Sequence, residues 1–110
     1  MIIMERSSFM LVFGSSAFVR VLDFFLNYDS YDYSIAQISR ETNTKWEVVE
    51  RIVKILLKKN IIKKTRKMGK AQLYMFNHDS DLSKLLQDID MRISEFFINK
   101  ELERQDIEAR

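Results

Sequence analysis

The feature of the sequence that most constrains its fold is a pair of helix-start signals in the segment "SIAQISRETNTKWEVVERIVKILLKK". The first is Ser34 with Gln37, and the second is Thr44 with Glu47. Each has the spacing of a capping box, in which two side chains bond each other's backbone amides at the start of a helix. Asn43 lies between them and tolerates the left-handed backbone of a tight turn. The segment therefore predicts a short helix, a turn and a longer helix, which form a helix–turn–helix.

Apolar residues recur at spacings of three and four on both of these helices and on one that precedes them. The preceding helix starts after Gly14, with Ser15 or Ser16 as its cap, and ends at Asn27. The short helix stops at Thr42, and the longer one runs to the end of the quoted segment. The predicted core-facing positions are Phe18, Val21, Leu22, Phe25 and Leu26, then Ile35, Ala36 and Ile38, and finally Trp46, Val49, Ile52, Val53 and Leu56.

The pattern changes to that of strands between residues 61 and 76. The runs "IIKKTR" and "AQLYMF" are rich in β-branched and aromatic residues. Between them lies "KMGK", where Gly69 can take the positive φ of a tight turn. We therefore expect a β-hairpin with a basic tip directly after the helix–turn–helix.

The net charge of +2 conceals an uneven distribution along the chain. Residues 43–76 carry ten basic and two acidic side chains, a net charge of +8, whereas residues 1–42 carry −2 and residues 77–110 carry −4. Basic charge concentrated in this way is the electrostatic footprint of a protein that binds a polyanion. A lysine-rich edge that only prevents aggregation is the alternative, and the adjacent helix–turn–helix disfavours it. A membrane partner is disfavoured because the charges lie on a hairpin rather than on an amphipathic helix.

A long helix is expected from residue 79 onward, capped by Asp79, Ser80 or Asp81 and running past residue 100. Its apolar residues follow a heptad seam that is widened on both sides, and they form the predicted dimer interface. Those residues are Leu82, Leu85, Leu86, Ile89, Ile93, Phe96 and Phe97, with Leu102 beyond them. We expect the helix to pair with its twin in a homodimer, together with "FMLVF" near the N-terminus. Folding back on its own domain is the open alternative.

Composition places the chain among single-domain globular proteins, with 46% hydrophobic and 31% charged residues over 110 residues. No apolar run approaches the ~18 residues of a membrane helix, and the start shows neither a basic leader nor a cleavage site. The absence of cysteine removes disulfides, thiol metal sites and a cysteine nucleophile. We expect a cytoplasmic protein without a cofactor or an evident small-molecule ligand.

The segments "FGSSAFVRVLDFFL" and "YSIAQISRETNTKWEVVERIVKILLKKNIIKKTRKMGKAQLYMF" resemble archaeal winged-helix transcriptional regulators of the MarR and ArsR type, over residues 14–76. The resemblance implies a mainly helical α+β fold, with a three-helix core and a β-hairpin wing over residues 14–77. Residues 78–110 would then form a dimerisation helix, which the N-terminal segment 1–13 could join. It also implies binding to double-stranded DNA, with the helix near Thr44 in the major groove and the wing on the backbone or minor groove. The sequence departs from the family in having Asn43 where glycine is usual, and in carrying Glu47 and Glu50 on the reading helix.

A helical wheel of residues 44–58 places several polar side chains opposite the core. Arg51 could read guanine, and Glu47 could accept from cytosine or, as we favour, bond Arg51 at i+4. Thr42, Thr44 and Lys45 could contact phosphates near the start of the helix. The complete set of predicted DNA-contacting residues is Thr42, Thr44, Lys45, Glu47, Arg51, Lys54, Lys64, Arg66, Lys67 and Lys70.

Other conspicuous residues have simpler interpretations. Trp46 borders the predicted core, so we assign it to packing. The tyrosines at 28, 31 and 33 could stack on bases, but they lie among aspartates. His78 lies beside a helix cap, which is a commoner setting than a metal site. No catalytic motif is present, so an enzyme is disfavoured, whereas a protein-interaction module remains an alternative because of Glu47 and Glu50. A basic hairpin does not by itself distinguish DNA from RNA.

Overall fold

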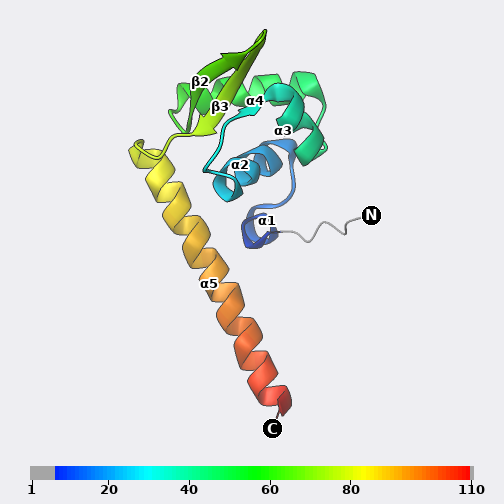
Figure 1. Ribbon diagram of the computed structural model, residues 1–110. Helices are drawn as coiled ribbons and strands as arrows, with labels where there is room; N and C mark the ends of the chain where they lie inside the picture. The colour runs from blue at the N-terminus through cyan, green and yellow to red at the C-terminus, as the bar shows by residue number, and fades with distance from the viewer. Residues whose placement is uncertain (1–6, 110) are drawn as a thin grey trace.

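A computed structural model describes residues 7–109, with the side chains of residues 7–105 (Figure 1). The described part contains five helices and three strands. In chain order they are α1 (Ser8–Phe13), α2 (Ala17–Asn27), β1 (Tyr33–Ser34), α3 (Ile35–Thr42), α4 (Trp46–Lys58), β2 (Ile62–Met68), β3 (Ala71–Phe76) and α5 (Asp81–Ala109). The strands form one antiparallel sheet in the order β1-β3-β2. The predicted α+β class, mainly helical, is confirmed.

The predicted starts of α2 and α3 are confirmed. The Ser16 hydroxyl accepts the backbone N–H of Val19 at 3.3 Å, which caps α2. At the start of α3 the capping box is complete, because the Gln37 N–H donates to Ser34 Oγ and the Ser34 N–H donates to Gln37 Oε1. The turn after α3 contains Asn43 in the left-handed conformation, with φ 50° and ψ 49°. Local signals therefore determine where these two helices begin and end.

The second predicted capping box, of Thr44 with Glu47, is wrong. The residue that caps α4 is Lys45, which makes no side-chain capping bond. The Thr44 side chain is buried instead, and its hydroxyl donates to the carbonyl of Thr42 at 3.1 Å. Since this hydroxyl bonds within the turn, it cannot reach the amides of the following helix. The helix therefore begins at Trp46, one residue later than the box would place it.

The hairpin of β2 and β3 is confirmed, with its tip at Gly69 and Lys70. Gly69 has φ +60° and is the first of the two loop residues, which is the position where a type II′ turn needs glycine. The pairing register shifts between Lys64 and Lys67, so β2 contains a bulge near the middle of the wing. The two strands project together from the body as a wing (Figure 1).

Strand β1 is an element that the sequence did not reveal. Tyr33 pairs with Tyr74, and Ser34 pairs with Leu73, so β1 extends the hairpin to a three-stranded sheet. It spans only two residues and follows a run of turn formers. Its conformation comes from pairing with β3, which no local pattern reports.

The core lies where α2, α3, α4 and the base of the hairpin meet. Its completely buried large side chains are Val21, Phe25, Ile38, Val49, Val53, Leu56, Ile62 and Phe76. Burying each large apolar side chain stabilises the fold by roughly 1.5–3 kcal/mol. Two predicted core positions are wrong. Ala36 lies on the outer face of α3, because Ile38 and Thr42 form the inner one. Trp46 is 48% exposed, because it is the first residue of α4 and lies beyond the edge of the core.

Helix α5 begins against the body and then leaves it (Figure 1). Its cap is Ser80, one of the three predicted candidates, whose hydroxyl accepts the Ser83 N–H at 3.4 Å. Ser83 is buried and donates from Oγ to the Ile61 carbonyl at 3.0 Å. Leu86 packs against the core. With 29 residues the helix runs past residue 100 as predicted, and it spans about 44 Å at ~1.5 Å per residue.

Helix α1 was not predicted. The Ser7 hydroxyl caps it by accepting the Met10 N–H at 3.1 Å, and the buried Phe9 joins the core. It packs against α5 and α2, so the N-terminal segment does lie beside the long helix. Residues 1–6 of the predicted 1–13 segment lie outside the described residues. Three helices, a hairpin wing and a long final helix make up the predicted winged-helix arrangement. None of the helices described here has the length and apolar character needed to cross a membrane.

Candidate nucleic-acid interface

A basic groove lies between α4 and the first strand of the wing. Arg51, Lys54 and Lys58 reach it from α4, and Lys64 reaches it from β2. The apolar side chains of Ile55 and Leu57 complete its lining. Within the described chain none of the four cations has an ion-pair partner. The structure thus brings together three predicted DNA-contacting residues, with Lys58 as a fourth, and leaves their charges available to a ligand. We call this feature the basic groove.

The predicted bond between Glu47 and Arg51 is absent from the described residues. Glu47 is exposed in the first turn of α4, where the partial positive charge of the helix end favours a carboxylate. The Arg51 guanidinium is consequently not neutralised by its own helix. Burial raises the pKa of the Tyr74 hydroxyl on β3, and the negative charge of Glu50 raises it further. Glu50 therefore lies toward the wing.

Thr42 and Thr44 are unsuited to the predicted role of phosphate contacts. Both side chains are buried. The Thr42 hydroxyl donates to the Ile38 carbonyl at 2.6 Å, and the Thr44 hydroxyl donates to the Thr42 carbonyl. They hold the turn of the helix–turn–helix from inside, and of the three residues predicted near the start of α4 only Lys45 is exposed.

Arg20 on α2 is a residue of the site that the sequence did not single out. Its guanidinium donates to the Thr42 carbonyl at 3.0 Å, to Thr44 Oγ1 at 3.0 Å and to the Ser15 carbonyl at 2.6 Å. The side chain is half-buried beneath the turn that precedes α4. Arg20 therefore fixes the position of α4 relative to α2. The available signal was a lone arginine in the apolar run "AFVRVLDFFL".

The residues of the wing that were predicted to contact phosphates differ in whether they are already paired within the protein. Lys67 and Lys70 are exposed at and near the tip. Arg66, by contrast, is bound to Asp32, with Nε 3.0 Å from Oδ2 and Nη2 3.3 Å from Oδ1. The Thr65 hydroxyl donates to the same carboxylate at 2.6 Å. These bonds, that from Arg66 first, lower the pKa of Asp32.

His78 connects the start of α5 to the loop before β1. Its Nε2 lies 2.8 Å from Asp29 Oδ2, and the Gln87 amide donates to the same oxygen at 2.9 Å. The hydrogen bond from His78 is the main cause of the lowered pKa of Asp29. No cluster of three potential metal ligands occurs in the part of the chain that the structure describes. The loop tyrosines Tyr28 and Tyr31 are exposed.

The predicted dimer-interface residues fall into two groups. Leu82, Leu85 and Phe96 are exposed, at 40%, 55% and 55%. The others, Leu86, Ile89, Ile93 and Phe97, are partly covered. Leu86 packs on its own core, so the first part of the seam belongs to the domain that carries it. Further exposed apolar residues on α5 and α1 are Met91, Ile98, Leu102, Leu11, Val12 and Phe13.

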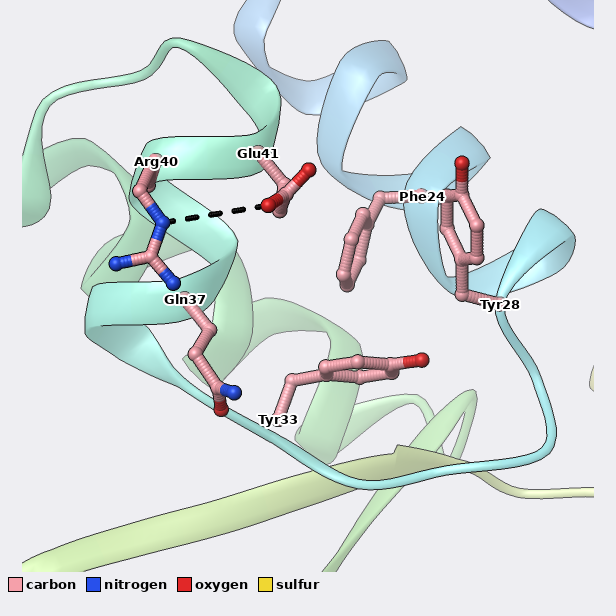
Figure 2. Close-up of a pocket in the computed structure, with 6 residues that line it drawn as sticks. All are labelled: Phe24, Tyr28, Tyr33, Gln37, Arg40 and Glu41. Atoms are coloured by element: carbon pink, nitrogen blue, oxygen red, sulfur yellow. Dashed lines mark ion pairs between the residues drawn. The ribbon is translucent and has the colours of Figure 1, made fainter.

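A second hollow lies between α2, α3 and the loop before β1 (Figure 2). Phe24, Tyr28 and Tyr33 form its aromatic wall, with ring centroids of Phe24 and Tyr33 4.8 Å apart. One face of α3 supplies Gln37, Arg40 and Glu41, and the last two form an exposed ion pair at 4.0 Å. Glu41 is the single carboxylate in the lining, so the hollow does not offer the paired acids of general acid–base chemistry.

Comparisons with known proteins support the fold. No protein-family model matches the chain, and no curated protein matches it in sequence. A possible transcriptional regulator from Methanosarcina mazei is 17% identical, with a TM-score of 0.55 over 83% of this chain and 76% of that one. ZitR from Lactococcus lactis, solved as a mutant in its apo form, is 12% identical, with a TM-score of 0.62 over 88% and 73%. The adhesin competence repressor AdcR from Streptococcus pyogenes is 14% identical, with a TM-score of 0.57 over 82% and 75%. At these identities the similarity is one of fold, and the chain has the winged-helix fold found in transcriptional regulators.

Proposed function

We propose that the protein is a transcriptional regulator that binds specific sequences of double-stranded DNA as a homodimer. The basic groove is the observation that carries this proposal, because it places unpaired cations from α4 and β2 on one exposed surface. In this arrangement α4 enters the major groove, and the wing lies on the backbone or in the minor groove. Residues 14–77 form the DNA-binding unit, and residues 78–110 form the dimerisation unit.

The two parts of this surface have different roles. Arg51 lies in the first half of α4 and has no partner in the described chain, so its guanidinium can bond guanine through two hydrogen bonds. Lys67 and Lys70 are exposed near the tip of a projecting hairpin, where they can neutralise phosphates of any sequence. Base preference therefore comes from α4, and the wing contributes affinity.

The homodimer follows from the apolar surface that the chain leaves uncovered. Exposed leucine and phenylalanine side chains continue along α5 beyond the point where the helix leaves the body. Pairing with a second copy would bury them, whereas the first turns of the helix, around Leu86, stay with their own domain. A two-fold pair of α4 helices would require a palindromic site.

Selection of bound sequences from a random duplex pool tests binding, base preference and palindromy in one experiment. We expect an enriched palindrome and an affinity that falls steeply with salt. Arg51→Ala should cost about 1–3 kcal/mol of discrimination at one base pair of each half-site. Lys58→Ala, at the far end of α4, is the matched control and should leave the base preference unchanged. The absence of any salt-sensitive duplex binding at micromolar protein would overturn the proposal.

A protein-interaction module is the second candidate, and the exposed carboxylate of Glu47 on the outer face of α4 is the observation that favours it. A carboxylate there repels phosphate but could pair with a basic partner. A gel shift with random duplex beside a pull-down separates the two candidates. Binding of a protein partner in place of duplex would favour the second.

A further inference from the structure

Trp46 is a large apolar side chain in the first turn of α4 that the protein leaves half exposed. It is 48% exposed. Within the described part of the chain its indole N–H donates no hydrogen bond, and its ring contacts no other ring and no cation. It is also the single tryptophan of the sequence. About half of this side chain is therefore available to a binding partner.

The direction of Trp46 follows from its spacing along α4. Trp46, Glu50 and Leu57 lie on one stripe, since they are separated by one and then two helical turns. Leu57 lines the basic groove together with Lys64 of β2, and Glu50 is close enough to Tyr74 of β3 to act on its hydroxyl. Trp46 thus lies at the N-terminal end of the stripe that faces the wing, beside the exposed Lys45.

The chemistry of the indole restricts what it can recognise on a duplex. It carries no charge and a single N–H donor, so most of its surface gains nothing from phosphates, and the faces of paired bases are covered by their neighbours. The floor of the major groove offers one apolar group, the C5-methyl of thymine. The first turn of a recognition helix is the part that reaches base edges. An exposed apolar ring at this position matches that methyl group.

We propose that Trp46 contacts a thymine methyl group in each half-site and selects an A·T pair there. This inference rests on the proposed function, and it adds a residue that determines specificity and the base it recognises. Arg51 and Trp46 then read different base pairs, one by hydrogen bonds and the other by apolar contact.

The first measurement uses Trp46 as its own reporter. Because the chain has one tryptophan, the emission excited beyond the absorption band of its four tyrosines comes from this site alone. Titration of the full-length protein with its selected duplex should change the Trp46 emission along the same curve as the anisotropy of a labelled duplex. Binding seen by anisotropy without any change in emission would overturn the inference while leaving the proposed function intact.

The second measurement removes only the methyl group. Replacing the contacted thymine of one half-site with deoxyuridine should weaken wild-type binding about fourfold, the equivalent of one buried methyl group. Trp46→Phe keeps an apolar ring and should retain part of this preference, whereas Trp46→Ala should bind both duplexes equally. Deoxyuridine outside the protected half-site is the matched control and should have no effect.

The outcomes separate the two proposals. Circular dichroism should show that Trp46→Ala keeps its helices, since the side chain lies outside the core. If the protein binds duplex but the wild type and Trp46→Ala respond equally to every deoxyuridine replacement, the role of Trp46 alone is overturned. Failure of the wild-type protein to bind any duplex overturns both this inference and the proposed function.

Discussion

Arg20 donates only to neutral acceptors: the Thr42 carbonyl and the Thr44 hydroxyl on the two sides of the turn, and the Ser15 carbonyl before α2. No carboxylate pairs with it in the described chain. Its positive charge therefore remains close to the start of α4, where it adds to the field that would attract a polyanion. One side chain thus has both a structural and an electrostatic effect on the same surface.

Replacing Arg20 with methionine should test the structural effect. We expect a loss of about 1–3 kcal/mol in the free energy of unfolding, because the Thr42 carbonyl and the Thr44 hydroxyl lose a charged donor. Urea denaturation followed by circular dichroism measures this loss. Arg40→Met is the matched control, since Arg40 is exposed and its ion pair with Glu41 is long at 4.0 Å. Equal midpoints for the two variants would contradict this account.

Asp90 on α5 gives a pH prediction at the same scale. Burial, and to a lesser extent the charge of Asp23 on α2, raise the pKa of Asp90. The folded protein therefore binds this proton more readily than the unfolded chain does, and stability falls as the pH rises from 3.8 through the raised folded pKa. Asp90→Asn should accordingly be more stable than the wild type at neutral pH, and the difference should vanish in acid.

Thermal unfolding across a pH series measures this difference. Asp88→Asn is the control, because Asp88 is exposed and pairs with Arg92 at i+4. It should change the melting temperature little or lower it slightly. A stabilisation by Asp90→Asn that persists unchanged at low pH would show that ionisation of Asp90 is not its cause.

Among the elements, the wing is distinguished by the hydrogen bonds that Thr65 and Arg66 donate to the Asp32 carboxylate, which we call the clasp. The clasp lies at the bulge in β2 and ties the wing to the residue before β1. It holds the wing in one direction, and it leaves the Arg66 guanidinium paired rather than available to a phosphate. The two basic residues at positions 66 and 67 are therefore not equivalent, although they are adjacent in sequence.

Salt titrations of DNA binding should reveal this difference. Lys67→Gln should reduce the slope of log K against log salt by about 0.9 for each protomer bound, the value for one phosphate contact on duplex DNA. Arg66→Gln should reduce the slope by less, because Asp32 already neutralises Arg66. Equal reductions would mean that Arg66 leaves Asp32 for a phosphate in the complex.

The elements also show what the sequence could and could not predict. Helices α2, α3, α4 and α5 and the hairpin have local signals in caps and apolar spacing, and all were predicted. Helix α1 and strand β1 were not, because α1 depends on the burial of Phe9 and β1 on pairing with β3. A short segment has too few residues for periodicity, so tertiary contacts determine its structure.

The candidate site was predictable in its cations but not in its hydroxyls. Arg51, Lys54 and Lys64 lie together as expected, because helix periodicity fixes which face is exposed. Thr42 and Thr44 were misassigned, since a threonine in a turn can bond inward to a carbonyl as readily as outward. The false box at Thr44 also placed the expected helix start one residue too early, at Lys45.

In the whole molecule, the basic surface lies on α4 and the wing, whereas exposed apolar side chains lie on α5. This separation gives a test of the proposed homodimer. Phe96 is 55% exposed on α5, with the Lys100 ammonium 5.6 Å from its ring centroid. Phe96→Glu would place a charge in the proposed dimer interface. We expect this variant to sediment as a monomer and to bind its duplex more weakly, because one of the two half-site contacts is lost.

Analytical ultracentrifugation at micromolar concentrations measures the oligomeric state. Tyr31→Glu is the control, because Tyr31 is also exposed but lies in the loop before β1. It should sediment as the wild type does. A wild-type protein that is already monomeric, or a Phe96→Glu variant that remains dimeric, would exclude this interface.

The buried Ser83 has a mechanical consequence for such a dimer. Its hydroxyl joins the first turn of α5 to the Ile61 carbonyl, three residues after α4 ends at Lys58, so a tilt of the long helix at this pivot would begin close to the reading helix. Over about 44 Å, at ~1.5 Å per residue, a tilt of roughly 5° at this pivot displaces the far end by about 4 Å. Half-sites on one face of a duplex are about 34 Å apart. In a dimer joined through α5, small changes in the angle of this helix at Ser83 would therefore change the distance between the two α4 helices.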